Sequence, residues 1–143
     1  MAKILFSLCL AVYMFSGYGF CQEKPQQVCI KNTCINIEVA DTESSRLQGL
    51  MFRQSLDQDS GMLFIFEQAG RTGFWLKNVR FALDLIWINQ DKKIVDIQTN
   101  ARPCQTEDCL IYYPVKDASF GLEVNAGFVA RHKIRVGDRV DFR

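Results

Sequence analysis

The sequence predicts a mainly β domain, either a β-sandwich or a barrel-like sheet of short mixed strands, with two short α-helices. Two observations indicate this fold class. Short apolar or alternating runs recur along the chain with polar turns between them, and only two segments have helical character. The chain has 143 residues, a length that allows one domain with a sizeable hydrophobic core.

The first predicted element is an antiparallel hairpin formed by Val28–Ile30 and Cys34–Val39, with Asn32-Thr33 at its tip. Apolar and polar residues alternate along the second arm, which is typical of a strand with one face in solvent.

An α-helix is expected next, running to about Phe52. Asp41 or Thr42 can cap its first turn, and Glu43 is favourably placed near the positive end of the helix dipole. The side chains expected to face the core are Leu47, Leu50 and Met51. Gly49 weakens the helix and indicates close backbone packing there.

A short apolar strand is predicted at Met62–Phe66, and the stretch Gly73–Asn89 holds the strand around which the fold is organised. The second half of this stretch alternates. One side carries Leu83, Leu85 and Trp87, and the other carries Asp84, Ile86 and Ile88. Because both sides are apolar apart from Asp84, we expect this strand to lie between two packed layers.

The remaining predicted elements are two strands, a short helix capped by Asn125 and a last strand. They cover Lys93–Thr99, Ser119–Val124, Ala126–His132 and Arg139–Phe142. Ala101–Pro114 has no periodicity, so it is expected to be a surface loop.

The N-terminal residues 1–19 are predicted to be a secretory signal peptide, followed by a linker over residues 20–27. A basic residue, an apolar run and small residues follow one another there, with cleavage expected near Gly19-Phe20. The apolar run is shorter than the roughly 20 residues of a membrane span, so we expect a mature chain without a transmembrane segment, in the periplasm or outside the cell. Acylation of Cys21 as a lipoprotein is disfavoured, because bulky Phe20 stands where such sites need a small residue.

Four cysteines of the exported part are expected to form two local disulfides, Cys29–Cys34 and Cys104–Cys109. Each pair flanks a four-residue polar loop, and opposed residues of an antiparallel pair are close enough for a disulfide. Four cysteines permit three pairings. Zinc binding is the weaker alternative, because the spacing is C-x4-C and an oxidising compartment favours disulfides.

Composition and charge exclude several classes of function. The chain has 17 basic and 16 acidic residues, a net charge of +1 and no basic run, so nucleic acid is not an expected partner. It has neither a G-x-S-x-G motif nor a glycine-rich phosphate loop, and its only histidine is His132. No metal and no cofactor is expected.

Six sequence blocks occur in an order that resembles a known family. The blocks are Gly49–Arg53, Gly61–Phe66, Phe74–Val79 with Leu83–Ile88 downstream, Ala101–Cys104, Leu122–Phe128 and Val136–Val140. They resemble the bacterial and archaeal family called domain of unknown function 192, over about Ile35–Arg143. This resemblance implies a compact β-sandwich domain, often exported, with no established activity. Leu76, Val79 and Ala82 stand where the family pattern has Met, Thr and Pro, so if that threonine hydroxyl serves a ligand in the family, Val79 puts this role in doubt here.

A polar constellation around Trp75 is the most suggestive candidate site; it consists of Arg53, Lys77, Asn78 and Asp84. The functional interpretation is a pocket with Trp75 as its floor that binds something small and hydroxylated or anionic. The structural interpretation is that Asp84 pairs with Arg53 or Lys77, while Asn78 satisfies backbone groups of a turn.

Glu123 lies in an otherwise apolar strand. With Asp84 it could form the carboxylate pair of a glycoside hydrolase, which needs groups roughly 5 to 9 Å apart. A buried, hydrogen-bonded glutamate is the competing interpretation.

The leading hypothesis is an exported, non-enzymatic β-sandwich domain that binds a small, saccharide-like or anionic ligand or a partner in the cell envelope. The alternative is a carboxylate-dependent, glycoside-type hydrolase that uses Asp84 and Glu123. The candidate ligand-binding residues are Arg53, Trp75, Lys77, Asn78, Asp84 and Glu123.

Overall fold

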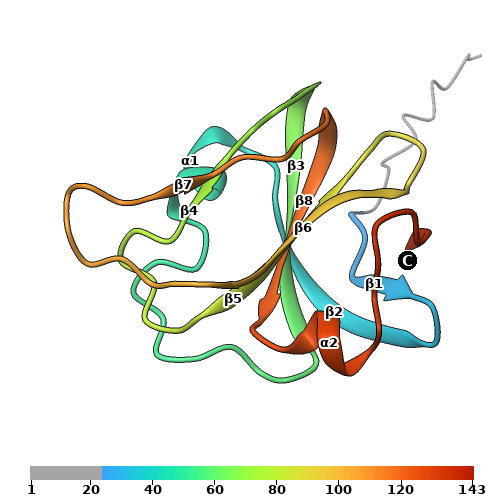
Figure 1. The fold of residues 1–143 in the computed structure, drawn as a ribbon, viewed down its shortest axis with the longest axis horizontal. Coiled ribbons are helices and arrows are strands. Elements are labelled where there is room, and N and C mark those ends of the chain that lie inside the picture. Colours follow the sequence, from blue (N-terminus) through green and yellow to red (C-terminus); the bar gives the residue numbers. More distant parts are fainter. Residues whose placement is uncertain (1–23) are drawn as a thin grey trace, which may run out of the picture.

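A computed structural model of the protein describes residues 24–143 (Figure 1). The predicted signal peptide, its cleavage site and Cys21 lie outside the described residues. The elements are β1 (Gln27–Ile30), β2 (Thr33–Ala40), α1 (Glu43–Gln48), β3 (Ser60–Gly70), β4 (Phe74–Trp75), β5 (Leu83–Ile88), β6 (Ile94–Ala101), β7 (Ile111–Tyr112), β8 (Ala118–Asn125), α2 (Phe128–Arg131) and β9 (Val140–Phe142). Strand β1 begins at Gln27, one residue before the first predicted hairpin arm.

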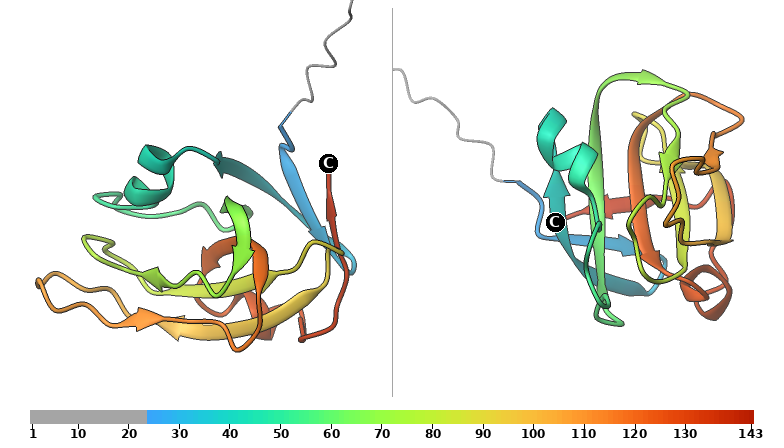
Figure 2. Two further views of the ribbon diagram at one scale, coloured as in Figure 1. Left: turned by 90° about the horizontal axis from the view of Figure 1, so that it is seen from above. Right: turned by 90° about the vertical axis from the view of Figure 1, so that its left-hand side faces the viewer.

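Seven strands form one curled sheet in the order β6-β5-β8-β3-β2-β1-β9, and β4 pairs with β7 in a separate two-stranded sheet. Neighbours in the large sheet are antiparallel except for β2 and β3. The sheet curls far enough for its two edges to meet (Figure 2). Ile94 N donates to Asp138 O at 3.0 Å, and Val140 N donates to Lys92 O at 2.9 Å. The expected mainly β fold with two short helices is confirmed, and the sheet takes the barrel-like form.

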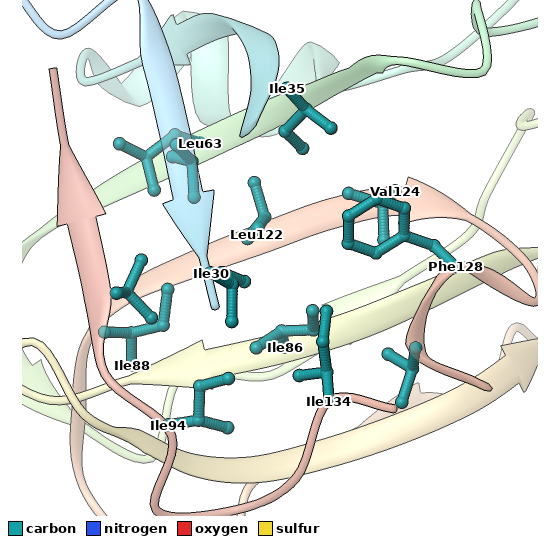
Figure 3. Close-up of a cluster of buried hydrophobic side chains, with 13 residues drawn as sticks. Ile30, Ile35, Leu63, Ile86, Ile88, Ile94, Leu122, Val124, Phe128 and Ile134 are labelled. Atoms are coloured by element: carbon teal, nitrogen blue, oxygen red, sulfur yellow. The ribbon is translucent and has the colours of Figure 1, made fainter. Parts of the chain in front are cut away.

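The sheet separates two hydrophobic cores. The α2-side core gathers side chains from seven strands, from α2 and from the segment after it, namely Val28, Ile30, Ile35, Leu63, Ile86, Ile88, Ile94, Leu122, Val124, Phe128, Val129, Ile134 and Val140. In Figure 3, Ile30, Leu63, Leu122 and Ile86 point toward one another from four different strands. The α1-side core consists of Ala40, Leu50, Met62, Phe64, Phe74, Leu76, Val79, Leu83, Leu85, Trp87, Ala101 and Ala118.

Strand β5 belongs to both cores, as its sequence predicts. Leu83, Leu85 and Trp87 enter the α1-side core, while Ile86 and Ile88 enter the α2-side core. Every residue of the strand is buried, because each face of β5 is covered by a separate layer of side chains.

Helix α1 is shorter than the sequence predicts. Thr42 caps it through a reciprocal pair of hydrogen bonds with Ser45, but the helix ends at Gly49 rather than near Phe52. Gly49 has a φ of +45°, and a Cβ there would lie 3.4 Å from the Phe64 ring, so the chain turns where it passes close to β3. Leu47, expected in the core, is 58% exposed.

Helix α2 is capped by a residue other than the one predicted. Its N-cap is Gly127, which has a φ of +88° and contributes no side chain. The Asp84 side chain, from β5, accepts a hydrogen bond from Val129 N at 2.9 Å instead. Asn125 donates from Nδ2 to the carbonyls of the Leu56-Asp57 turn, at 2.9 and 3.0 Å.

Both predicted cysteine pairs, Cys29–Cys34 and Cys104–Cys109, are disulfide-bonded in the structure. The first bond joins two residues that face each other in the β1–β2 hairpin. The second closes a turn in the predicted surface loop, which also contains β7. In the described part of the chain, neither helix has the length or apolar character to span a membrane.

Candidate functional site

A cavity of about 250 Å³ lies between α1 and the face of the sheet that carries the α1-side core. We call it the α1 cavity. Its walls come from α1 and the turn after it, β3, the segment at Thr72–Trp75, Val79 and β8. Ligand pockets for drug-sized molecules span roughly 300–1,000 Å³, so this cavity suits a smaller molecule.

Four aromatic side chains line the cavity, namely Phe64, Phe66, Phe74 and Trp75. Phe64 and Phe66 share one face of β3 because side chains in a strand alternate. Phe74 lies directly on the backbone of β8, since a Cβ on Gly121 would be only 2.2 Å from its ring. The Phe64 and Phe74 rings meet edge to face with centroids 4.9 Å apart, which fixes the aromatic wall.

Glu123 also lines the cavity, from the middle of β8. Its cross-strand neighbours in β3 and β5 are Met62 and Leu85, so the carboxyl has apolar side chains on both flanks. Glu123 is only 3% exposed, and its Oε2 atom has no hydrogen-bond partner among the described residues. Burial raises the pKa of Glu123 to about 8, because desolvation disfavours the charged form.

Two further ionisable side chains line the cavity, both from α1. Arg46 is already engaged: Nη1 donates to Asp41 O at 2.8 Å and to Ile65 O at 3.1 Å, and Nη2 donates to Glu67 Oε1 at 2.6 Å. Glu43 is exposed, in the first turn of the helix. Glu123 is therefore the one deeply buried ionisable group of the described lining.

An open groove adjoins the cavity and shares part of its α1 lining. Trp75, Lys77 and Asn78 line this groove, and Trp75 lines the cavity as well. Lys77 Nζ lies 5.6 Å from the centre of the Trp75 ring and 2.9 Å from Glu107 Oε2. Three of the sequence-predicted site residues are thus brought together beside a cavity.

Asn78 has a backbone role in addition to its place in the groove. Its φ is +58°, its N–H donates to Cys104 O at 2.8 Å, and its carbonyl accepts from Phe52 N at 2.8 Å. Its main chain therefore connects the turn after α1 to the disulfide loop.

Arg53 and Asp84 lie away from the cavity and the groove. Arg53 binds the Glu38 carboxylate with both terminal nitrogens, with Nη2 at 2.7 Å from Oε2. Asp84 accepts from Asn100 N and Val129 N, each at 2.9 Å. The expected pairing of Asp84 with Arg53 or Lys77 is wrong, because β5 turns Asp84 toward α2.

Asp84 and Glu123 face opposite sides of the sheet. Asp84 is opposed to Val124 and Glu123 is opposed to Leu85 in the β5–β8 register, so alternation directs the two side chains to different cores. The structure does not bring this carboxylate pair together, and Glu123 is not hydrogen-bonded as the competing interpretation expected.

Sequence reasoning identified Trp75 but missed the other three residues of the aromatic wall. Phe64, Phe66 and Phe74 look like ordinary core residues in the sequence, because nothing local marks a strand as bordering a cavity. Gly121 is the one available signal, since a glycine inside a strand indicates the close approach of another group. Among residues 24–143, no group of three or more His, Cys, Asp or Glu side chains is arranged to hold a metal ion.

The fold and the site define a small mainly β domain with a curled sheet and an apolar, acid-containing cavity on one face. The chain belongs to the DUF192 family of uncharacterised proteins, whose sequence model matches residues 26–142. This match confirms the resemblance seen in the sequence blocks.

One curated relative and two solved structures are similar to this chain. A UPF0127 protein of Pyrococcus furiosus is 27% identical over 114 residues, which cover 78% of this chain and 90% of that protein. A crystal structure of a protein of unknown function from Novosphingobium aromaticivorans is 29% identical with a TM-score of 0.75, covering 81% of this chain and 84% of the other. A second structure, from Sinorhizobium meliloti, is 32% identical with a TM-score of 0.72, covering 81% of this chain and 90% of the other.

Proposed function

We propose that this protein is an exported, non-enzymatic domain that binds a small molecule in the α1 cavity, with the groove as its entrance. The observation that carries the proposal is the unpartnered carboxyl of Glu123 at an otherwise mainly apolar cavity. A buried polar group without a partner costs about 1–3 kcal/mol. A ligand with one polar group and an apolar body supplies the missing partner and fills the space.

The groove supports the same function from the outside. Trp75 is 39% exposed and lines both the groove and the cavity, so its ring offers a surface to a molecule that passes from one to the other. Lys77 and Asn78 are half-buried beside it and can contact hydroxyl groups at the outer end of a ligand. A saccharide-like or an anionic ligand, as the sequence suggested, would use these outer contacts.

Export is the second part of the proposal. Two disulfides within a chain of this size are compatible with an oxidising compartment outside the cytoplasm. The ligand would then be a molecule that reaches the periplasm or the cell exterior.

Binding is tested with four probes: choline, its uncharged isostere 3,3-dimethyl-1-butanol, the anion 3,3-dimethylbutanoate, and glucose. We expect at least one probe to shift the NMR signal of the Trp75 indole N–H in a saturable way and to raise the Tm. A ligand whose free concentration is ten times its Kd stabilises the folded state by about 1.4 kcal/mol.

The Val79→Phe variant tests whether the bound probe occupies the cavity, because buried Val79 lines it and the larger ring fills it. The matched control is Val136→Phe, at an exposed valine. If Val79→Phe fails to fold, Thr72→Trp replaces it in the test. Thr72 is an exposed residue of the cavity lining, and the larger ring blocks the same cavity. Loss of binding in the cavity variants but not in the control supports the proposal. Binding by none of the four probes, or binding unaffected by the cavity variants, overturns it.

A further inference from the structure

We propose that the ligand of the α1 cavity is a small organic cation, an amine or a quaternary ammonium compound whose charged group lies against Glu123 among the aromatic side chains. This inference rests on the proposed function and names the chemical class of the ligand.

The charges of the cavity lining favour a cation. Of its three ionisable side chains, Arg46 is neutralised by Glu67 and by two backbone carbonyls, while Glu43 and Glu123 are acidic. An anion in the cavity would lie near Glu123, and the described residues that line the cavity offer it no free cationic side chain. A cation would give the Glu123 carboxylate the partner that a buried charge requires.

The nearby cations do not offer an alternative site for an anion. Lys77 lies in the groove rather than the cavity and is paired with Glu107. Arg53 lies away from both the cavity and the groove, and Glu38 binds both of its terminal nitrogens. The two cations that line the cavity and the groove, Arg46 and Lys77, thus each already pair with a carboxylate.

The aromatic wall supplies the second attraction. Phe64, Phe66, Phe74 and Trp75 line the same cavity as Glu123, and a cation near an aromatic face gains about 0.5–2 kcal/mol. Lys77 Nζ already lies 5.6 Å from the centre of the Trp75 ring on the groove side. Cages of aromatic rings are a recurring means by which proteins recognise quaternary ammonium ligands.

The protonation of Glu123 couples cation binding to pH. Burial raises its pKa to about 8, and a bound cation favours the ionised form. Binding below about pH 8 therefore releases a proton. The other charged groups facing Glu123 are Glu43 and Arg46 from α1, since its neighbours in β3 and β5 are Met62 and Leu85.

The deciding experiment compares choline, 3,3-dimethyl-1-butanol and 3,3-dimethylbutanoate, which share one shape and differ in charge. At a pH above about 8, we expect choline to bind at least about tenfold more tightly than the alcohol, and the butanoate to bind most weakly. Below that pH the affinity for choline should fall by up to about tenfold per pH unit, because one proton must leave. Choline itself has no proton that titrates in this pH range. A change of its affinity with pH therefore reports on an ionisable group of the protein.

The Glu123→Gln variant keeps the shape of the side chain and removes its charge. We expect it to lose the preference for choline and the pH dependence, while it still binds the alcohol. Asp91→Asn, which removes one negative charge from an exposed turn, should leave the affinity for choline unchanged. If the alcohol or the butanoate binds as tightly as choline, or if Glu123→Gln keeps the preference, the cation proposal is overturned while the binding function stands. If no probe binds, the binding function itself falls.

Discussion

Asp84 and Glu123 are buried carboxyl groups in neighbouring strands, and their surroundings differ. Asp84 is 0% exposed but accepts two backbone hydrogen bonds, from Asn100 and Val129. Glu123 is nearly as buried, and its Oε2 atom has no partner in the described structure. A carboxyl that caps a helix stabilises the fold, whereas an unpartnered carboxyl at a cavity costs stability and is available to a ligand. We therefore assign a structural role to Asp84 and a binding role to Glu123.

Glu123 should make the stability of the free protein depend on pH. Its pKa is about 8 in the folded state, against 4.5 ordinarily, so the folded state holds the proton more tightly than the unfolded state. The cost of burying Glu123 is therefore smallest below about pH 4.5, where the group is protonated in both states, and it grows until the pH passes about 8. The free energy of unfolding should fall across this range with a limiting slope of about 1.4 kcal/mol per pH unit.

The measurement is urea unfolding of the wild type and of Glu123→Gln across this pH range. The wild type and the variant have all other ionisable groups in common. The difference between their free energies of unfolding therefore reports on Glu123 alone. We expect the variant to gain stability relative to the wild type as the pH rises. Parallel curves would show that Glu123 titrates normally.

At the scale of elements, the site is held by short pieces of structure attached to a rigid sheet. Helix α1 contributes no buried side chain, and β4 and β7 are two residues each. The disulfide loop anchors this region: Cys104 N donates to Leu76 O at 3.0 Å, and Asn78 N donates to Cys104 O at 2.8 Å. We infer that the Cys104–Cys109 bond keeps the groove in shape.

The two disulfides allow a matched test of this role, because both join cysteines with a sequence separation of 5. Replacing either pair by serine should cost about 2 kcal/mol of unfolding free energy, as expected for a small closed loop. Only the Cys104→Ser/Cys109→Ser variant should also shift the NMR signal of the Trp75 indole, since β4 pairs with β7 next to this loop. Equal shifts in the Cys29→Ser/Cys34→Ser variant would contradict the local role.

At the scale of the whole molecule, the curled sheet protects its own edges. Strands β6 and β9 stand at the ends of the strand order, yet hydrogen bonds between Lys92–Ile94 and Asp138–Val140 join them. Joined edges present few free backbone groups for pairing with other chains. The two disulfides are compatible with a location outside the cytoplasm.

Export predicts that the native protein lacks its first residues. We expect a mature chain that begins near Phe20, because the N-terminal segment has the pattern of a signal peptide. Intact-mass analysis of the protein from its own cells measures this directly. A chain that retains Met1–Gly19 in the cytoplasmic fraction would refute export, and an added diacylglycerol mass on Cys21 would establish a lipoprotein.

The sequence by itself determined the mainly β class, the two-sided burial of β5, both disulfides and the family. These features depend on alternation along one strand, on residues close in sequence, or on ordered blocks, all of which are local in the chain. The end of α1 was misplaced because Gly49 turns the chain against the ring of Phe64, a contact with a distant strand.

Only the tertiary structure decided which polar residues form the site. Trp75, Lys77 and Asn78 were predicted together because they are close in sequence, and they do share the groove. Arg53 pairs with Glu38 instead. The α1 cavity combines α1, β3, β4 and β8, segments separated by many residues that only the curl and pairing of the sheet bring together. Whether a buried glutamate is partnered or free depends on those long-range contacts, and sequence periodicity carries no information about them.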